Sequence, residues 1–294
     1  MKTEKKSILI TGSEGQVGQE LKVLSEKYPD YSFFYIDVKD LDITDSDAVH
    51  TFFQKNKIDF CINCAAYTAV DKAEEHFETA HKVNVIGVKN LMDGCKLKET
   101  KLIQLSTDYV YHNSQNTPFK EEDITNPQGV YACTKLKGDE IALKGGGMVI
   151  RTSWVYSSFG HNFVKTMLRL GTERNEISVI FDQIGTPTFA RDLAQVILQV
   201  IQKIDSGEID ASCFSDVYHF SNEGVTSWYD FAMAIFEIKN INIKVNPIET
   251  KDYPTPAKRP PFSVLNKGKI KSTFGVEVPY WRSSLAECLA LMDR

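Results

Sequence analysis

Three glycines follow a short apolar run near the start of the chain, with the spacing G-x-x-G-x-x-G. The run at 8–11 is typical of a buried parallel strand, and a helix is predicted to begin near Gln16. Gly12, Gly15 and Gly18 lie in and just after the turn between them. Glycines let backbone N–H groups approach a pyrophosphate, and a helix N-terminus adds unpaired donors and the positive end of its dipole. Alone, this spacing fits an ordinary glycine-rich turn equally well, because most dinucleotide-binding turns read G-x-G-x-x-G.

Apolar runs and helical patterns alternate through the first half of the chain. Strands are predicted at 7–11, 32–37, 59–63, 101–106 and 148–153, and helices near 16–28, 45–56, 72–97 and 127–144. This alternation predicts an α/β fold with a doubly wound, Rossmann-type parallel sheet.

The pattern loosens after Trp154. Helices are predicted near 161–171, at 190–204 and at 226–236, with a short strand near 177–180. We therefore expect a dinucleotide-binding domain from residues 1–155 plus about 190–219. A smaller, discontinuous C-terminal substrate lobe would comprise about 156–189 and 220–294, with the substrate in the cleft between the two parts.

A tyrosine and a lysine four residues apart follow the fourth predicted strand. Pro127 can open a helix, on which Tyr131 and Lys135 share one face. An ammonium beside a phenol favours the phenolate, which lowers the pKa of the tyrosine toward working pH and makes it a usable general acid. The lysine can also reach a ribose hydroxyl. The alternative is a surface Tyr–Lys pair on an amphipathic helix.

Thr107 gives this pair a context. It ends the predicted strand 101–106, and open parallel sheets place their ligands at the carboxyl ends of strands. Its hydroxyl can therefore donate to a substrate carbonyl that Tyr131 protonates.

These segments together resemble the extended short-chain dehydrogenase/reductase family, and within it the dTDP-4-dehydrorhamnose reductases. The resemblance runs nearly end to end and is carried by segments 8–21, 63–74, 106–111, 131–135, 151–156 and 259–265. Thr134, Cys133 and Asn266 depart from the usual pattern, but none of these changes removes a catalytic atom.

The resemblance implies a reaction and the residues that perform it. The C4 ketone of dTDP-4-dehydro-β-L-rhamnose would be reduced to dTDP-β-L-rhamnose, the final step of dTDP-rhamnose biosynthesis, with NADPH or NADH as the hydride source. Thr107, Tyr131 and Lys135 would be catalytic. Coenzyme would bind at Gly12, Gly15, Gln16, Val17, Gly18, Asp37, Asp42, Ile43, Ala65, Ala66, Tyr67, Tyr131 and Lys135. Substrate would bind at Val70, Thr107, Asp108, Trp154, Asn162 and Arg259.

Two rival functions stay open at this point. A nucleotide-sugar epimerase or dehydratase would share the fingerprint and keep its coenzyme without net oxidation. A non-catalytic, reductase-like regulatory subunit would share the fold, although the intact Thr107, Tyr131 and Lys135 argue against it.

Coenzyme choice depends on the end of the second predicted strand. An acidic residue about 20 residues past the glycine turn can accept from a ribose 2′-OH, and Asp37 holds that place. No arginine follows it to receive a 2′-phosphate, although Lys39 could serve in part. The sequence therefore favours NADH. The resemblance further implies that Asn84 supports the active-site helix.

The charge of the chain limits its partners. A formal net charge of −5 disfavours nucleic acid, and a nucleotide-sugar diphosphate needs a local cation, for which Lys258 and Arg259 are the candidates. A solvated charge pair in a proline-rich loop is the alternative. Trp154 could likewise be core filling rather than a wall of the sugar site.

Cysteine use and hydropathy bear on location. Cys61 and Cys64 lie three apart on a predicted strand, so they face opposite ways and are expected to be buried thiols rather than a metal or redox pair. No apolar run suggests a membrane span or a signal peptide, which predicts a cytoplasmic protein. No metal is expected. The resemblance leaves a homodimer open, because some relatives dimerise around magnesium, but the sequence offers no clear ligand set.

Overall fold

A six-stranded parallel sheet forms the centre of the computed structural model, which describes residues 5–293. Residues 1–4, which belong to the segment where no signal peptide is expected, lie outside the described residues. The strand order is β10-β5-β4-β3-β1-β2. The strands are β1 (Lys6–Thr11), β2 (Tyr31–Ile36), β3 (Phe60–Asn63), β4 (Lys101–Thr107), β5 (Met148–Thr152) and β10 (Val217–His219). The order reverses between β1 and β3, where a doubly wound sheet opens a crevice for ligands.

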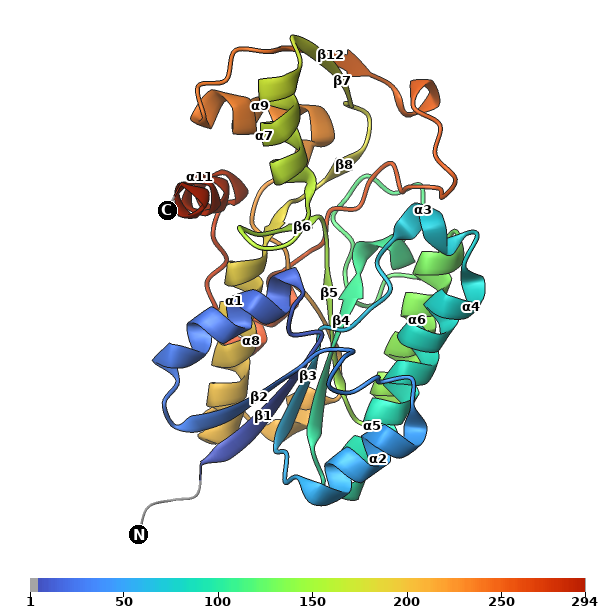
Figure 1. Cartoon of the computed structure of the whole chain (residues 1–294), viewed down its shortest axis with the longest axis vertical. Coiled ribbons are helices and arrows are strands. Elements are labelled where there is room, and N and C mark those ends of the chain that lie inside the picture. Colours follow the sequence, from blue (N-terminus) through green and yellow to red (C-terminus); the bar gives the residue numbers. More distant parts are fainter. Residues whose placement is uncertain (1–4, 294) are drawn as a thin grey trace.

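Helices cover both faces of this sheet (Figure 1). On one face lie α1 (Gln16–Leu24), α8 (Ala190–Asp205) and α10 (Gly268–Phe274), and on the other α2 (Ser46–Lys55), α5 (Val88–Leu97) and α6 (Val130–Lys144). Successive side chains of β1 alternate between the faces: Ile8 and Ile10 pack with α1 and α8, and Leu9 packs with α2 and α5. Strands buried on both faces explain the continuous apolar runs. In the described part of the chain, no helix is long and apolar enough to cross a membrane.

A smaller lobe lies above the carboxyl ends of the strands (Figure 1), and it has an apolar cluster of its own. It contains α7 (Phe163–Glu173), α9 (Trp228–Ile238), α11 (Trp281–Met292) and the parallel pair β7 (Glu176–Ile180) and β12 (Lys244–Ile248). Two short strand pairs join it to the sheet: β6 (Val155–Tyr156) with β9 (Thr188–Phe189), and β8 (Ile184–Gly185) with β11 (Thr226–Ser227).

The helix that carries Tyr131 starts later than the sequence predicts. We expected it to open at Pro127, but α6 begins at Val130, after Gly129 with φ +84°. A carboxylate from another segment explains the shift, because Val130 N donates to Glu74 Oε1 at 2.8 Å. A Cβ on Gly129 would lie 2.5 Å from that oxygen, so only glycine admits the cap.

The predicted helix 72–97 is also wrong as a single element. It comprises α3 (Val70–Ala73), α4 (Phe77–His81), the π-helical turn η2 (Lys82–Gly87) and α5. Asn84 lies in η2 with its side chain fully engaged: Oδ1 accepts from Tyr67 N at 2.9 Å, and Nδ2 donates to Tyr67 O and Thr134 Oγ1. The wider turn therefore holds the loop after β3 against α6.

Candidate active site

A cavity of about 790 Å³ opens where the carboxyl ends of the strands meet the lobe. Most lining residues come from the sheet side; the lobe side contributes Trp154, Val155, Gly160, His161 and Trp228. Of the residues expected to bind coenzyme or substrate, those in the lining are Gly12, Gly15, Gln16, Val17, Asp37, Asp42, Ile43, Ala65, Ala66, Val70, Thr107, Asp108, Tyr131, Lys135 and Trp154.

The glycine turn forms one end of the cavity. Gly12 has φ +63°, and a Cβ there would lie 2.6–2.9 Å from backbone atoms of Ala65 and Cys64. Gly15 precedes α1 without a side-chain cap, so the first N–H groups of the helix are left for another acceptor. A Cβ on Gly18 would lie 2.6 Å from Gly12 O, so a glycine at this position lets α1 pack closely against the turn. Gly18 does not line the cavity. This cradle fits a dinucleotide pyrophosphate.

An acidic edge follows β2 at the same end. Asp37 lines the cavity and accepts backbone N–H bonds from Glu14 at 3.1 Å and from Val38 at 2.8 Å. Asp42 and Ile43 line the cavity beyond it. A carboxylate fixed beside the turn is placed to accept from ribose hydroxyls.

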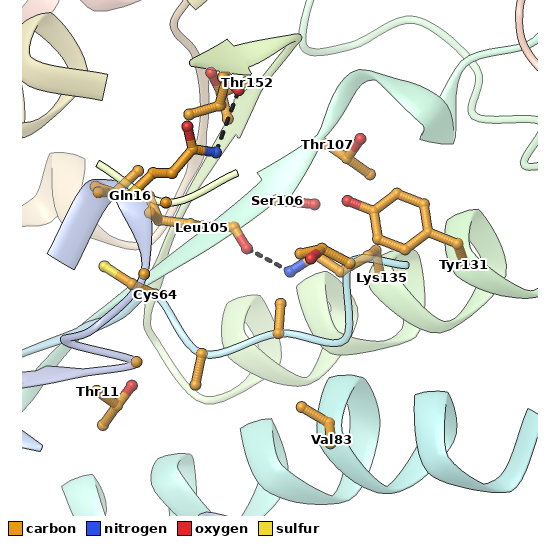
Figure 2. Close-up of a pocket in the computed structure, with 18 of the residues that line it drawn as sticks. Thr11, Gln16, Cys64, Val83, Leu105, Ser106, Thr107, Tyr131, Lys135 and Thr152 are labelled. Carbon is orange, nitrogen blue, oxygen red and sulfur yellow. Dashed lines mark hydrogen bonds between the residues drawn. The ribbon is translucent and has the colours of Figure 1, made fainter. Parts of the chain in front are cut away.

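Tyr131, Lys135 and Thr107 converge between α6 and the end of β4 (Figure 2). Lys135 is buried and donates from Nζ to Leu105 O at 2.6 Å. The Tyr131 hydroxyl points toward the end of β4, where the Thr107 side chain lies. The phenol, the hydroxyl and the ammonium thus face one cavity, as a carbonyl reductase requires.

The expected effect of Lys135 on Tyr131 is wrong for this structure. Burial raises the pKa of Tyr131 to about 12, and the hydrogen bond with Thr107 only partly opposes this. Burial also lowers the pKa of Lys135, whose ammonium donates to the Leu105 carbonyl. The phenol is therefore protonated at neutral pH, as a proton donor must be.

Asp108 adds a buried carboxyl beside Thr107. Thr107 Oγ1 donates to Asp108 Oδ1 at 3.1 Å. Burial raises the pKa of Asp108 to about 7, although hydrogen bonds with Ser263 and Thr107 oppose the rise. The end of β4 therefore presents a second group that can exchange a proton near neutral pH.

Four expected site residues lie outside the cavity lining: Gly18, Tyr67, Asn162 and Arg259. Tyr67 is held through its backbone by Asn84, as described above. Asn162 caps α7 and donates to Gln16 Oε1 at 3.0 Å, so it links the lobe to the start of α1.

Arg259 is engaged with a carboxylate. Its Nη1 and Nη2 donate to the two oxygens of Asp71 at 3.0 and 2.7 Å, and Nη1 also donates to Thr255 and to the carbonyl of Ala257. The fork ties the loop around residues 255–259 to the segment of α3. It holds the pKa of Asp71 below its usual value.

Sequence reasoning missed several residues that line the cavity. They are Thr11, Val38, Leu41, Cys64, Thr68, Val83, Leu105, Ser106, Tyr109, Thr152, Val155, Gly160 and Trp228. Most adjoin a predicted residue, so strand ends could have suggested them. Trp228 has no such neighbour: it opens α9, and only the fold brings it to Trp154.

Comparisons with known proteins agree with this geometry. The family described as RmlD substrate binding domain matches residues 6–294. A dTDP-4-dehydrorhamnose reductase from Aggregatibacter actinomycetemcomitans is 40% identical, with 97% of this chain and 99% of the relative covered. A crystal structure of one from Clostridium acetobutylicum has a TM-score of 0.92 at 41% identity, covering 98% of this chain and 100% of the other. One from Bacillus anthracis, in complex with NADP, has a TM-score of 0.92 at 34% identity, covering 98% and 100%.

Proposed function

The chain belongs to the family of the RmlD substrate binding domain, and on that premise we propose that it reduces the C4 ketone of dTDP-4-dehydro-β-L-rhamnose to dTDP-β-L-rhamnose with NADPH or NADH. This reaction is the final step of dTDP-rhamnose biosynthesis. The observation that carries the proposal is the convergence of Tyr131, Thr107 and Lys135 in a cavity that begins at a glycine turn.

The residues fit a nicotinamide coenzyme. Gly12 and the open N-terminus of α1 would hold the pyrophosphate, and Asp37 would accept from the ribose on the adenine side. Lys135, buried at the far end, would donate to the other ribose. When bound, the reduced coenzyme supplies the hydride.

The protein's own groups would handle the proton and the charge. Thr107 would donate to the C4 carbonyl oxygen, so that negative charge develops against a positioned donor. Tyr131 would transfer its proton to that oxygen. The lobe would exclude water from this end of the cavity.

Substrate recognition involves residues from both parts of the chain. Val70 and Trp154 would pack against the sugar, and Asp108 would accept from its hydroxyls. Arg259 would meet the diphosphate from the loop that it now ties to Asp71, and Asn162 would support this side through Gln16. Residues 1–155 plus about 190–219 would form the coenzyme part, and about 156–189 and 220–294 the substrate part.

The test is a coupled measurement on the purified protein. With the keto sugar and either reduced coenzyme, we expect loss of the coenzyme's near-ultraviolet absorbance and formation of dTDP-rhamnose by chromatography. Stereochemical change at the sugar without net coenzyme oxidation would indicate an epimerase instead. If the protein binds coenzyme but shows neither coenzyme oxidation nor a change in the sugar, the proposal is contradicted.

The setting of the enzyme belongs to the same proposal. It would act in the cytoplasm, and its six free cysteines suit a reducing compartment. Association as a homodimer is also proposed, and light scattering of the purified chain would measure it.

A further inference from the structure

Two tryptophan rings from distant segments stack at the lobe side of the cavity. Trp154 follows β5 and Trp228 opens α9. Their ring centroids are 3.6 Å apart and their planes differ by 10°. Both are half-buried and both line the cavity. Stacked indoles give a large, rigid apolar surface.

Trp228 is fixed from several sides. Its Nε1 donates to Gln183 Oε1 at 3.2 Å, and Gln183 is itself buried. The ring of Phe163 lies 4.7 Å away. Ser227, the residue before it, caps α9 and is paired with Ile184 of β8. The indole of Trp228 is therefore part of the framework of the lobe.

Trp154 depends on its neighbours for its position. Its φ is +47°, a left-handed conformation that is uncommon for a residue with a large side chain. A Cβ on Gly185 would lie 2.6–2.7 Å from Cε2 and Cζ2 of the Trp154 ring, so glycine makes room for the indole. Strained residues persist where the surrounding structure over-determines them. Here Gly185 and the ring of Trp228 both constrain Trp154.

We propose that Trp228 is a positioning and specificity residue for the sugar of the substrate. It holds Trp154 in place and completes a two-indole wall of the cavity, opposite in character to the polar groups of Thr107 and Tyr131. The inference rests on the proposed function, because it assigns this wall to a nucleotide-bound 6-deoxy sugar. Ring C–H atoms and a C6 methyl suit indole carbons, whereas a C6 hydroxyl there would be buried without a partner.

The test separates sugar recognition from recognition of the nucleotide. In Trp228→Ala we expect the KM for the keto sugar and the inhibition constant of dTDP-rhamnose to rise about 10-fold or more, as a buried aromatic contact is lost. The inhibition constant of dTDP, which has no sugar ring, and the Kd of the coenzyme should stay within about two-fold. Trp228→Phe, which retains a ring, should recover part of the loss.

Circular dichroism supplies a readout that does not depend on turnover. Stacked indoles couple their far-ultraviolet transitions and give a pair of bands of opposite sign. We expect Trp228→Phe to abolish this couplet. Trp281→Phe is the matched control, because it removes one buried indole from the lobe core and should keep both the couplet and the dTDP-rhamnose affinity.

Each contrary result has a distinct meaning. The assignment of Trp228 would be overturned if Trp228→Ala weakened the binding of dTDP and of dTDP-rhamnose equally. It would also be overturned if both Trp228 variants bound dTDP-rhamnose as wild type does. A wild-type protein that neither reduces the keto sugar nor binds dTDP-rhamnose would overturn the proposed function and this inference with it.

Discussion

The proton donor is the residue on which the chemistry depends most directly. Tyr131→Phe removes the hydroxyl and keeps the ring, so turnover should fall about 10²- to 10⁴-fold with little change in coenzyme affinity. Steady-state kinetics and coenzyme titration would measure both. Tyr156→Phe is the control, because the Tyr156 hydroxyl is buried in the lobe core and has no hydrogen-bond partner among the residues that the structure describes. Near-normal turnover in Tyr131→Phe would remove Tyr131 from its assigned role.

Coenzyme preference is also set by single residues. Asp37 lies where a ribose 2′-OH would be bound, and it would repel a 2′-phosphate. Asp37→Ala should therefore weaken the binding of NADH more than the binding of NADPH, and the ratio of the two KM values should change. Asp93→Ala, which removes only an exposed ion pair with Lys89, should leave the ratio unchanged. A constant ratio in Asp37→Ala would show that the carboxylate does not contact the ribose.

At the scale of elements, the Arg259–Asp71 pair ties a lobe loop to α3. If Arg259 leaves Asp71 to bind the substrate diphosphate, Arg259→Ala should raise the KM for the nucleotide sugar about 10-fold or more, the value of a charge-assisted hydrogen bond. Arg259→Lys should recover only part of this, because an ammonium lacks the planar fork. Coenzyme binding should hardly change.

The variant Asp71→Asn distinguishes two roles for Arg259: binding the substrate diphosphate, or only holding the loop in place through Asp71. It weakens the ion pair but leaves the guanidinium in place, so the KM for the nucleotide sugar should not rise if Arg259 binds the diphosphate. An equal rise in Asp71→Asn and Arg259→Ala would mean that the pair acts only by holding the loop.

The elements that the sequence predicts well are those whose signal is local. Apolar runs such as 8–11 identify five of the six sheet strands, because β1, β3, β4 and β5 are buried along most of their length and the edge strand β2 is partly buried. The three-residue strand β10 is too short to give such a run. The start of α6 was missed because its cap, Glu74, comes from another segment.

The features of the site also fall into those that the sequence could predict from local patterns and those that it could not. Glycine spacing and the Tyr131–Lys135 pair are local patterns, and the structure brings both to one cavity. The contact of Trp228 with Trp154, the engagement of Arg259 by Asp71 and the high pKa of Tyr131 all arise from long-range packing and burial. A single sequence has no local signal for any of them.

For the whole molecule, two buried groups make opposite contributions to acid stability. Burial raises the pKa of Asp108 to about 7, so below that pH the folded chain binds a proton that the unfolded chain does not. Burial lowers the pKa of His219 to about 3, so below about 6.5 the unfolded chain binds the extra proton. Acidification therefore stabilises the fold through Asp108 and destabilises it through His219.

Variants should separate these contributions between about pH 5 and pH 6.5, where most carboxylates do not yet titrate. Removing one contribution changes the slope by up to about 1.4 kcal/mol per pH unit, or about 2–4 °C in Tm. As the pH falls through this range, the Tm of His219→Asn should rise relative to that of wild type. The Tm of Asp108→Asn should fall relative to that of wild type. Scanning calorimetry would measure both slopes. Slopes equal to wild type in both variants would contradict the assignment.

The helix α10 lies against the sheet although it comes late in the chain. Ile270 and Phe274 pack in the same cluster as Ile8 and Ile10 of β1, and the Phe274 ring contacts Tyr218 of β10 at 5.0 Å. At about 5–20 residues per second, a ribosome would add the residues of α10 roughly 15–50 s after it makes β1. During that interval one face of the sheet lacks its full cover. A chain released by a premature stop codon before α10 would expose apolar surface and become a substrate for chaperones and proteases.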